Sequence, residues 1–255
     1  MEGSTLAGPA AYDRAASDLL RTLAGELEQA VPRRRARKRM LDVALASTLL
    51  LVLAPVLFLI ALAVVIESPG PVFYRARRVG WRGKPLHMLK FRKMVPEARG
   101  GRLTVDGDLR LTRVGAVLSK TRLDELPQLL HVLRGDMSFV GPRPEDPDFV
   151  AARADDYAEI LTARPGLTGL SQLAFAKEQV ILHADEPERD YLDRIFPQKC
   201  GLDRLYVRCA SASCDLSVLA WTCAAVVLRR DIAVNRVTGR LGLRRRPAPD
   251  PQVTA

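Results

Sequence analysis

The stretch VALASTLLLVLAPVLFLIALAVVI, residues 43–66, contains no charged side chain and decides the broad class of the fold. Its length is typical of a membrane helix, because about 20 apolar residues are needed to cross the hydrocarbon core. A cleaved signal peptide would have a shorter apolar core nearer the N-terminus, followed by small residues. Here Glu67 and the turn sequence SPGP at 68–71 follow instead. The stretch therefore predicts a helix that remains in the membrane.

Basic residues flank the apolar stretch on both sides. The sequence RRRARKR at 33–39 precedes it, and by the positive-inside rule this holds the start of the segment on the cytoplasmic side. Residues 68–96 carry eight basic and no acidic side chains, a poor composition for a translocated segment. Pro55, in the middle of the stretch, removes a helix hydrogen bond and predicts a kink. We therefore predict a re-entrant helix-break-helix at 38–67, with a straight span that tolerates its proline as the alternative.

The whole chain is basic, with 39 Lys and Arg against 29 Asp and Glu and a formal charge of +10. Such a charge predicts a polyanionic partner: nucleic acid, anionic lipid or a phosphorylated small molecule. Because the arginine cluster adjoins the apolar stretch, lipid is favoured and no nucleic-acid partner is expected. The four cysteines fall within 200–223 without a C-x-x-C spacing, so we expect reduced thiols and no zinc site.

The predicted fold is mixed α/β and mainly helical, with a membrane element and a small cytosolic α/β domain. The chain divides into an arm (1–37), a re-entrant membrane helix (38–67), a cytosolic catalytic domain (68–230) and a basic tail (231–255). The tail is expected to be disordered after Leu243. Residues 216–228 are apolar enough for an interfacial helix but too few for a second span. The arm has an amphipathic pattern at Leu19, Leu20, Leu23 and Leu27.

Two further patterns organise the cytosolic domain. Strand-like runs on either side of Gly80 and Gly83 predict a hairpin. Apolar residues at roughly helical spacing predict a helical region over 114–133, in which Pro127 interrupts or begins a turn. This places adjacent acidic residues, at positions 124 and 125, near a helix start.

The neighbourhood of this pair, Asp124 and Glu125, favours chemistry on phosphate over an ordinary solvated surface. A carboxylate that attacks phosphorus needs nearby cations, and a second carboxylate can hold a magnesium ion that bridges a diphosphate. Lys120 and Arg122 are close in sequence. Downstream, the rigid loop Gly-Pro-Arg-Pro holds the guanidinium of Arg143, which suits bidentate phosphate binding.

Several short motifs follow one another over roughly residues 37–230. They are KR with Asp42 at 38–42, KFR at 90–92, Asp108 with Arg110, Thr112 and Arg113, LDELPQL at 123–129, RGDMS at 134–138, VGPRP at 140–144 and RPGLTG at 164–169. In order and spacing this set resembles the bacterial sugar transferase family, the monotopic phosphoglycosyl transferases of glycan assembly. Asp203-Arg204-Leu205-Tyr206 and Asp215 are similar to the family's closing segment.

The resemblance implies a single-leaflet protein of the bacterial inner membrane, with its catalytic domain on the cytosolic face and a ping-pong reaction of the EC 2.7.8 class. Asp124 attacks the sugar-proximal phosphate of a nucleotide diphosphate sugar, such as a UDP-sugar, and expels the nucleoside monophosphate. Undecaprenyl phosphate, a polyprenyl phosphate, then accepts the sugar phosphate. This would be the first membrane step of exopolysaccharide, O-antigen, capsule or glycoconjugate synthesis.

The same resemblance implies roles for individual residues. Glu125, together with Asp124, holds Mg²⁺. The implied phosphate-binding residues are Lys90, Arg92, Lys120, Arg122, Arg143 and Arg164. The residues implied at the membrane and the lipid carrier are Lys38, Arg39 and Pro55.

The chain departs from the family pattern at three positions. Ser119 stands five residues before Asp124, where many members have a basic residue, so Lys120 or Arg122 would supply the charge. Ala54 precedes the proline where Ser is common. His131, which we expect to be a partly buried helix residue, stands where Asn is frequent. A different class of function stays open, a membrane-anchored binding or scaffold protein of a polysaccharide assembly complex, as do the sugar, the pathway and a homo-oligomeric state.

Overall fold

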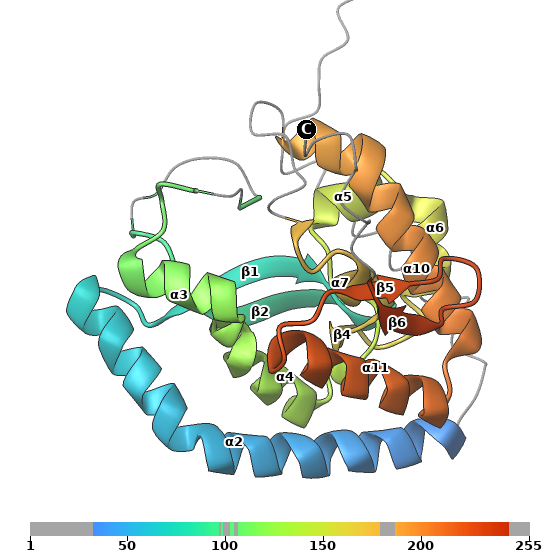
Figure 1. Cartoon of the computed structure of the whole chain (residues 1–255), viewed down its shortest axis with the longest axis horizontal. Helices are drawn as coiled ribbons and strands as arrows, with labels where there is room; N and C mark the ends of the chain where they lie inside the picture. The colour runs from blue at the N-terminus through green and yellow to red at the C-terminus, as the bar shows by residue number, and fades with distance from the viewer. Residues whose placement is uncertain (1–32, 97, 99–102, 105–106, 179–186, 245–255) are drawn as a thin grey trace, which may run out of the picture.

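The computed structural model describes residues 33–96, 98, 103–104, 107–178 and 187–244. The leucine pattern of the arm lies outside these residues, and so does the tail from 245 onward. The described chain is mixed α/β and mainly helical, as the sequence predicts, with one long apolar helix wrapped along one side of a smaller body (Figure 1).

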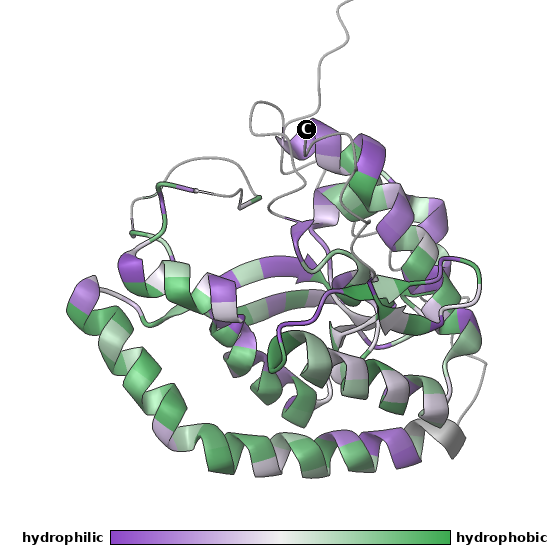
Figure 2. Ribbon diagram, in the orientation of Figure 1, coloured by the Kyte–Doolittle hydropathy of each residue, from purple (hydrophilic) through white to green (hydrophobic). Residues whose placement is uncertain are grey.

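The membrane element is helix α2 (Arg33–Glu67). Among the described residues, it contains the only segment, Ala36–Glu67, that is long and apolar enough to cross a membrane. Helical structure continues through Pro55, and Figure 1 shows α2 bent into two limbs, so the predicted break takes the form of a bend. Many apolar side chains of α2 face outward, among them Leu51 at 79% and Phe58 at 68% exposure. In Figure 2 the ribbon of α2 is green or pale along most of its length, with hydrophilic residues near its start.

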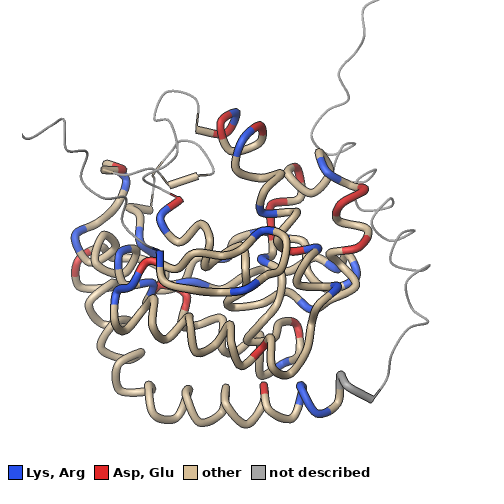
Figure 3. Tube along the Cα trace, turned by 45° about the vertical axis from the view of Figure 1, so that its right-hand side comes forward, with Lys and Arg blue, Asp and Glu red and all other residues tan. Residues whose placement is uncertain are grey.

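Charge is absent from most of α2. Figure 3 shows basic residues at its start and, beyond Asp42, an uncharged helix as far as Glu67. Buried Ile60 and Val64 of the second limb pack with Phe91 and Leu118 in a small apolar cluster. This cluster joins the second limb of α2 to the body of the protein.

The predicted hairpin is confirmed. Strands β1 (Phe73–Val79) and β2 (Pro85–Phe91) pair antiparallel, and a short turn of 3₁₀ helix, η1 (Trp81–Gly83), connects them. Leu86 and Met88 are buried in the main core. Because alternate residues of a strand share a face, Lys90 continues this inward face beyond Met88.

The helical region after the hairpin is broken into three pieces. These are α3 (Arg113–Thr121), the 3₁₀ helix η2 (Leu123–Gln128) and α4 (Leu129–Arg134). The sequence predicts one interruption of this region, at Pro127. The structure has a second, earlier interruption at Arg122, whose backbone is left-handed with φ 62° and ψ 13°. Thr112 caps the start of α3 by accepting a hydrogen bond from the Gly115 N–H at 2.9 Å.

The rest of the body is built around a short parallel pair of strands, β3 (Ser138–Val140) and β4 (Gly166–Thr168). The other elements are α5 (Pro147–Ala151), α6 (Ala154–Ile160), α7 (Leu170–Ala174), α9 (Pro187–Asp190), the π-helix η3 (Tyr191–Ile195), α10 (Phe196–Cys209), α11 (Ala212–Val226), β5 (Ile232–Val234) and β6 (Leu241–Leu243). Buried aromatic side chains from α5, α6, η3 and α10 pack together at the centre of this half.

Three features of the C-terminal part bear on the sequence predictions. The β5–β6 hairpin contacts α7 and α11, so part of the segment predicted as a basic tail is an ordered hairpin packed on the body. The cysteines are free, with Cys200 buried and Cys209 and Cys223 exposed. Helix α11 covers most of the apolar run predicted for an interfacial helix, and Leu216 on it is 70% exposed.

Candidate active site

The acid pair lies in the first turn of η2, directly after the left-handed residue Arg122. A left-handed residue ends α3 and starts a new helical turn in a different direction. The turn packs against β2, so both carboxylates point into the body instead of outward from α3. Asp124 is 3% and Glu125 9% exposed. Solvated surface acids would be far more accessible, so this pair is built into the interior.

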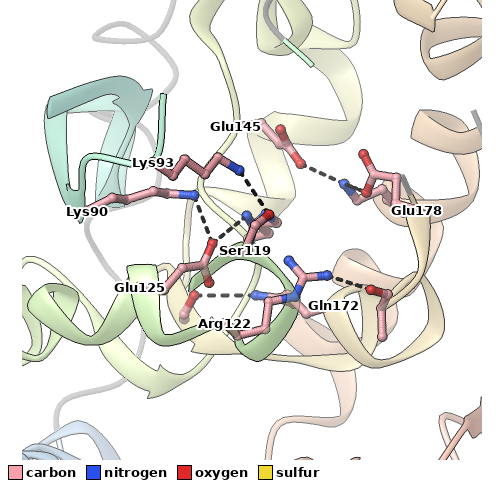
Figure 4. A network of polar contacts seen from close by, with 12 residues as sticks. Lys90, Lys93, Ser119, Arg122, Glu125, Glu145, Gln172 and Glu178 are labelled. Atoms are coloured by element: carbon pink, nitrogen blue, oxygen red, sulfur yellow. Dashed lines mark hydrogen bonds and ion pairs between the residues drawn. The ribbon is translucent and has the colours of Figure 1, made fainter. Parts of the chain in front are cut away.

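Two cations hold the carboxylate of Glu125. Its Oε1 accepts a hydrogen bond from Lys90 Nζ at 2.8 Å and from Arg143 Nη2 at 3.1 Å (Figure 4). Burial alone would raise the pKa of Glu125, but the charges of Lys90 and Arg143 hold that pKa well below its usual range. Glu125 is therefore ionised and fixed. Its second oxygen, Oε2, has no hydrogen-bond partner within the described residues.

Asp124 is in a different position from its neighbour. Its carboxylate makes no hydrogen bond or ion pair with the described part of the chain. Burial, and then the charge of Glu125, raise the pKa of Asp124, while Lys90, Lys93 and Arg122 oppose that rise. Glu125 is thus paired with two cations, whereas Asp124 has no hydrogen-bond or ion-pair partner among the described residues.

Arg143 reaches Glu125 from a loop held between two backbones. The β3–β4 pairing and the hydrogen bonds just beyond it lay residues 138–142 against residues 165–168. A Cβ added to Gly141 would lie 2.3 Å from Arg164 O, and one added to Gly166 would lie 2.1 Å from Gly141 N. Only glycine permits this approach, which explains why both motifs contain it.

Buried polar groups support the same loop from behind. Lys199 Nζ donates to Glu145 Oε1 at 3.1 Å and to Glu178 Oε2 at 3.0 Å. Asp203 accepts hydrogen bonds from the Ser171 hydroxyl at 2.6 Å and from the backbone N–H of Arg143. Burial raises the pKa of Asp203 to about 7. The sequence patterns gave no role to Glu145 or Lys199, because neither is close in sequence to the acid pair.

The other predicted phosphate-binding residues are spread over the body. Lys120 is exposed near the end of α3. The Arg122 guanidinium donates to the Ala176 carbonyl, and its charge contributes to the low pKa of Glu125 and opposes the rise in the pKa of Asp124. Arg92 donates to the carbonyls of Ser68 and Pro69, just beyond the end of α2. Arg164 lies over the Trp81 ring, with Cζ 4.3 Å from its centroid.

The residues predicted at the membrane join α2 to the body. Lys38 Nζ donates to Asp215 Oδ2 at 2.8 Å and to Val140 O at 2.9 Å. The Arg39 guanidinium donates to the carbonyls of Val132 and Leu133, at the end of α4. Both side chains therefore fix the first limb of α2 against the catalytic body.

His131 is a buried helix residue, slightly more buried than the sequence predicts. Its Nε2 accepts a hydrogen bond from the Leu89 N–H at 3.2 Å, and Nδ1 lies 3.2 Å from Asp136 Oδ2. The ring thereby ties β2 to α4 beside the acid pair.

One cation at the site was missed in the sequence. Lys93 Nζ lies 3.5 Å from Ser119 Oγ, beside Lys90 and Glu125 (Figure 4). In the sequence Lys93 was only one of many basic residues after the membrane stretch. A signal was present, because Ser119 occupies a position where a basic residue was expected and Lys93 is one of the basic residues that follow the predicted hairpin strand.

The carboxylates are compatible with Mg²⁺, although within the described residues no cluster of three or more His, Cys, Asp or Glu side chains could hold a metal by itself. Magnesium commonly binds through one or two carboxylates together with substrate phosphates and water. Glu125 Oε2 and the Asp124 carboxylate provide hard oxygen ligands of this kind, and neither accepts a hydrogen bond from the residues that the structure describes.

Comparison with known proteins defines the class. A family model described as bacterial sugar transferase matches residues 33–229, and the chain belongs to that family. Over 142 residues it is 50% identical to the UDP-glucose:undecaprenyl-phosphate glucose-1-phosphate transferase of Caulobacter vibrioides, an alignment covering 54% of this chain and 53% of that protein. The protein of the same name in Escherichia coli K12 is 42% identical over 148 residues, or 54% of this chain and 31% of that protein.

A relative of more similar extent is the exopolysaccharide production protein ExoY of Rhizobium meliloti. It is 37% identical over 210 residues, which are 76% of this chain and 86% of that protein. The alignment with the Caulobacter protein, by contrast, spans about half of its length.

Proposed function

We propose that the chain transfers a sugar 1-phosphate from a nucleotide diphosphate sugar, most simply a UDP-sugar, to undecaprenyl phosphate. The observation that carries the proposal is the unequal environment of two adjacent buried carboxylates. Glu125 is held by Lys90 and Arg143, while Asp124 is free of hydrogen bonds from the described residues and lies among cations. The relatives named as undecaprenyl-phosphate glucose-1-phosphate transferases support the choice of substrates.

The first step is a displacement at the sugar-proximal phosphorus. A carboxylate oxygen of Asp124 forms a bond to this phosphorus, and the bond to the nucleoside monophosphate oxygen breaks. The leaving group departs with the electron pair as nucleoside monophosphate. Negative charge on the phosphoryl oxygens increases the need for nearby cations, and Lys90, Arg143 and Arg122 are already in place without reorganisation.

The second step reverses the roles of carboxylate and acceptor. A phosphate oxygen of undecaprenyl phosphate attacks the same phosphorus, and the bond to Asp124 breaks. The product is undecaprenyl diphosphate sugar, and the Asp124 carboxylate is regenerated. Glu125 stays ionised throughout because Lys90 and Arg143 stabilise its charge.

Magnesium fits this scheme as a proposed cofactor held by Glu125 and Asp124. When bound, it would offset the charge of the diphosphate and orient it. Arg143, fixed by its glycine-containing loop and by Asp203, would orient the phosphate through its planar guanidinium.

For the membrane element we propose a re-entrant topology, in which both ends of α2 lie at the cytosolic face of the inner membrane. Three observations support it. α2 is bent, its first limb is fastened to the catalytic body by Lys38 and Arg39, and its second limb packs through Ile60 and Val64 on the same body. A helix attached to one body at both limbs is difficult to reconcile with a straight crossing.

The test uses purified protein in detergent with undecaprenyl phosphate, Mg²⁺ and a panel of UDP-sugars. We expect magnesium-dependent release of UMP with one sugar, together with a lipid-linked sugar diphosphate. A protein that binds the lipid but releases no UMP from any sugar nucleotide would instead favour a scaffold role.

A further inference from the structure

Lys93 is held firmly at the acid pair by its backbone. Its carbonyl accepts a hydrogen bond from the Thr112 N–H at 3.0 Å, at the start of α3. A Cβ added to Gly115 would lie 1.9 Å from this same carbonyl oxygen, so the first turn of α3 touches the Lys93 backbone. The position of the Lys93 side chain is therefore determined by β2 and α3 together.

The ammonium group of Lys93 is not neutralised by an ion pair. Within the described residues its hydrogen-bond partner is the Ser119 hydroxyl, at a long 3.5 Å. An ammonium carries three donors, so at least two remain for another ligand. Lys90, by contrast, is committed to Glu125 at 2.8 Å.

The Lys93 side chain lies beside Lys90 and the Glu125 carboxylate. In Figure 4 Lys93 and Lys90 approach Ser119 and Glu125 from the same side. Asp124 is the largest favourable charge acting on Lys93, and Lys93 in turn stabilises the ionised form of Asp124. A partly desolvated ammonium beside a free carboxylate is suited to an anionic group that joins both.

We propose that Lys93 is a catalytic residue whose ammonium contacts the phosphoryl oxygens transferred to and from Asp124, with Ser119 holding it in place. This inference rests on the proposed function and adds a division of labour to it. Lys90 and Arg143 contact the phosphate while they also hold Glu125, whereas Lys93 has no ion pair among the described residues and acts on the reacting phosphate alone. Lys93, two residues beyond the end of β2, thus supplies the positive charge that was expected on α3 at position 119.

The primary test compares Lys93→Met with Lys84→Met in a single turnover without undecaprenyl phosphate, where UMP release reports the first step. Lys84 is an exposed lysine at the opposite end of β2, so its loss controls for charge and expression. We expect Lys93→Met to slow release about ten- to a hundredfold, the loss of one charge-assisted contact in the transition state. Lys84→Met should match wild type.

Rescue by a second cation separates a catalytic from a structural role. Lys93→Arg keeps a positive charge beside Ser119, so it should recover part of the single-turnover rate of UMP release that Lys93→Met loses. Lys93→Gln, which keeps a polar group without charge, should stay as slow as Lys93→Met. Equal rates for Lys93→Arg and Lys93→Gln would overturn the proposal even if Lys93→Met failed to fold.

The outcomes also separate this inference from the proposed function. Active wild type with Lys93→Met within twofold of it would refute the role of Lys93 alone. Wild type that releases no UMP from any nucleotide sugar would refute both.

Discussion

Replacing Glu125 with glutamine tests how much the fold depends on the charge at the centre of the site. The substitution keeps the shape but removes the negative charge that Lys90 Nζ and Arg143 Nη2 approach to 2.8 and 3.1 Å. Breaking a buried pair in this way costs about 3–5 kcal/mol. The three side chains retain 12–23% exposure, so screening reduces the expected loss to about 2–4 kcal/mol. The melting temperature should fall by about 5–15 °C.

The pH dependence of this loss has a definite sign. The pKa of Glu125 is depressed in the folded protein, so its stabilisation is fully present above the unfolded value of about 4.3. It is lost as pH falls through the lower folded pKa. The difference in melting temperature between wild type and Glu125→Gln should therefore be constant near neutral pH and shrink in acid.

The assay is thermal unfolding in detergent, with Glu159→Gln as the matched control. Glu159 also pairs with arginines, at 2.6 Å from Arg208, but its side chain is 29% and that of Arg208 59% exposed, so solvent screening weakens this pair more than the pairs of Glu125. UMP release should be severely impaired in Glu125→Gln and normal in the control. Equal melting temperatures for the two variants would show that Glu125 is not held as described.

Three further outcomes are expected. Arg143→Lys should lose about tenfold or more in turnover because an ammonium cannot reproduce the planar fork, and near wild-type turnover would assign Arg143 a structural role. Burial raises the pKa of Asp203 in the folded protein to about 7, whereas the same carboxyl in the unfolded chain ionises near pH 4. Wild-type stability should therefore fall as pH rises from about 4 to 7, and Asp203→Asn should flatten this dependence in thermal unfolding. A cysteine at Pro69, in a background without exposed Cys209 and Cys223, should resist labelling from outside the cell, whereas efficient labelling would establish a straight span.

Much of the fold follows from local patterns. The uncharged stretch predicted helix α2, and Pro55 predicted the bend in it. The strand-like runs on either side of Gly80 and Gly83 predicted the hairpin. The parallel strands β3 and β4 were not predicted, because three-residue strands have too little periodicity to recognise. The β5–β6 hairpin was missed for the same reason, within a segment whose composition is typical of a tail.

The site was predictable only in part. Asp124, Glu125, Lys90 and Arg143 do meet, as the motifs imply. Spacing could not show that Arg92, two residues past Lys90, turns away to carbonyls at the end of α2. Strand alternation stops at Phe91, and the direction of later side chains depends on tertiary contacts.

The left-handed backbone of Arg122 was hidden for a related reason. Non-glycine residues seldom adopt φ 62°, so the sequence gives no local signal for this turn. It is nevertheless the feature that buries the acid pair, which a continuous helix would have left nearer the surface.

The most direct test of the aspartyl route is to look for the covalent intermediate. Protein is incubated with Mg²⁺ and UDP-sugar radiolabelled in the sugar-proximal phosphate, without undecaprenyl phosphate, then denatured and digested. We expect label on the peptide that contains Asp124 in wild type, none in Asp124→Asn, and discharge of the label on adding undecaprenyl phosphate. Asp124→Asn that still turns over, or a wild type that transfers normally yet never retains label, would contradict attack by Asp124 and favour direct transfer between the two substrates.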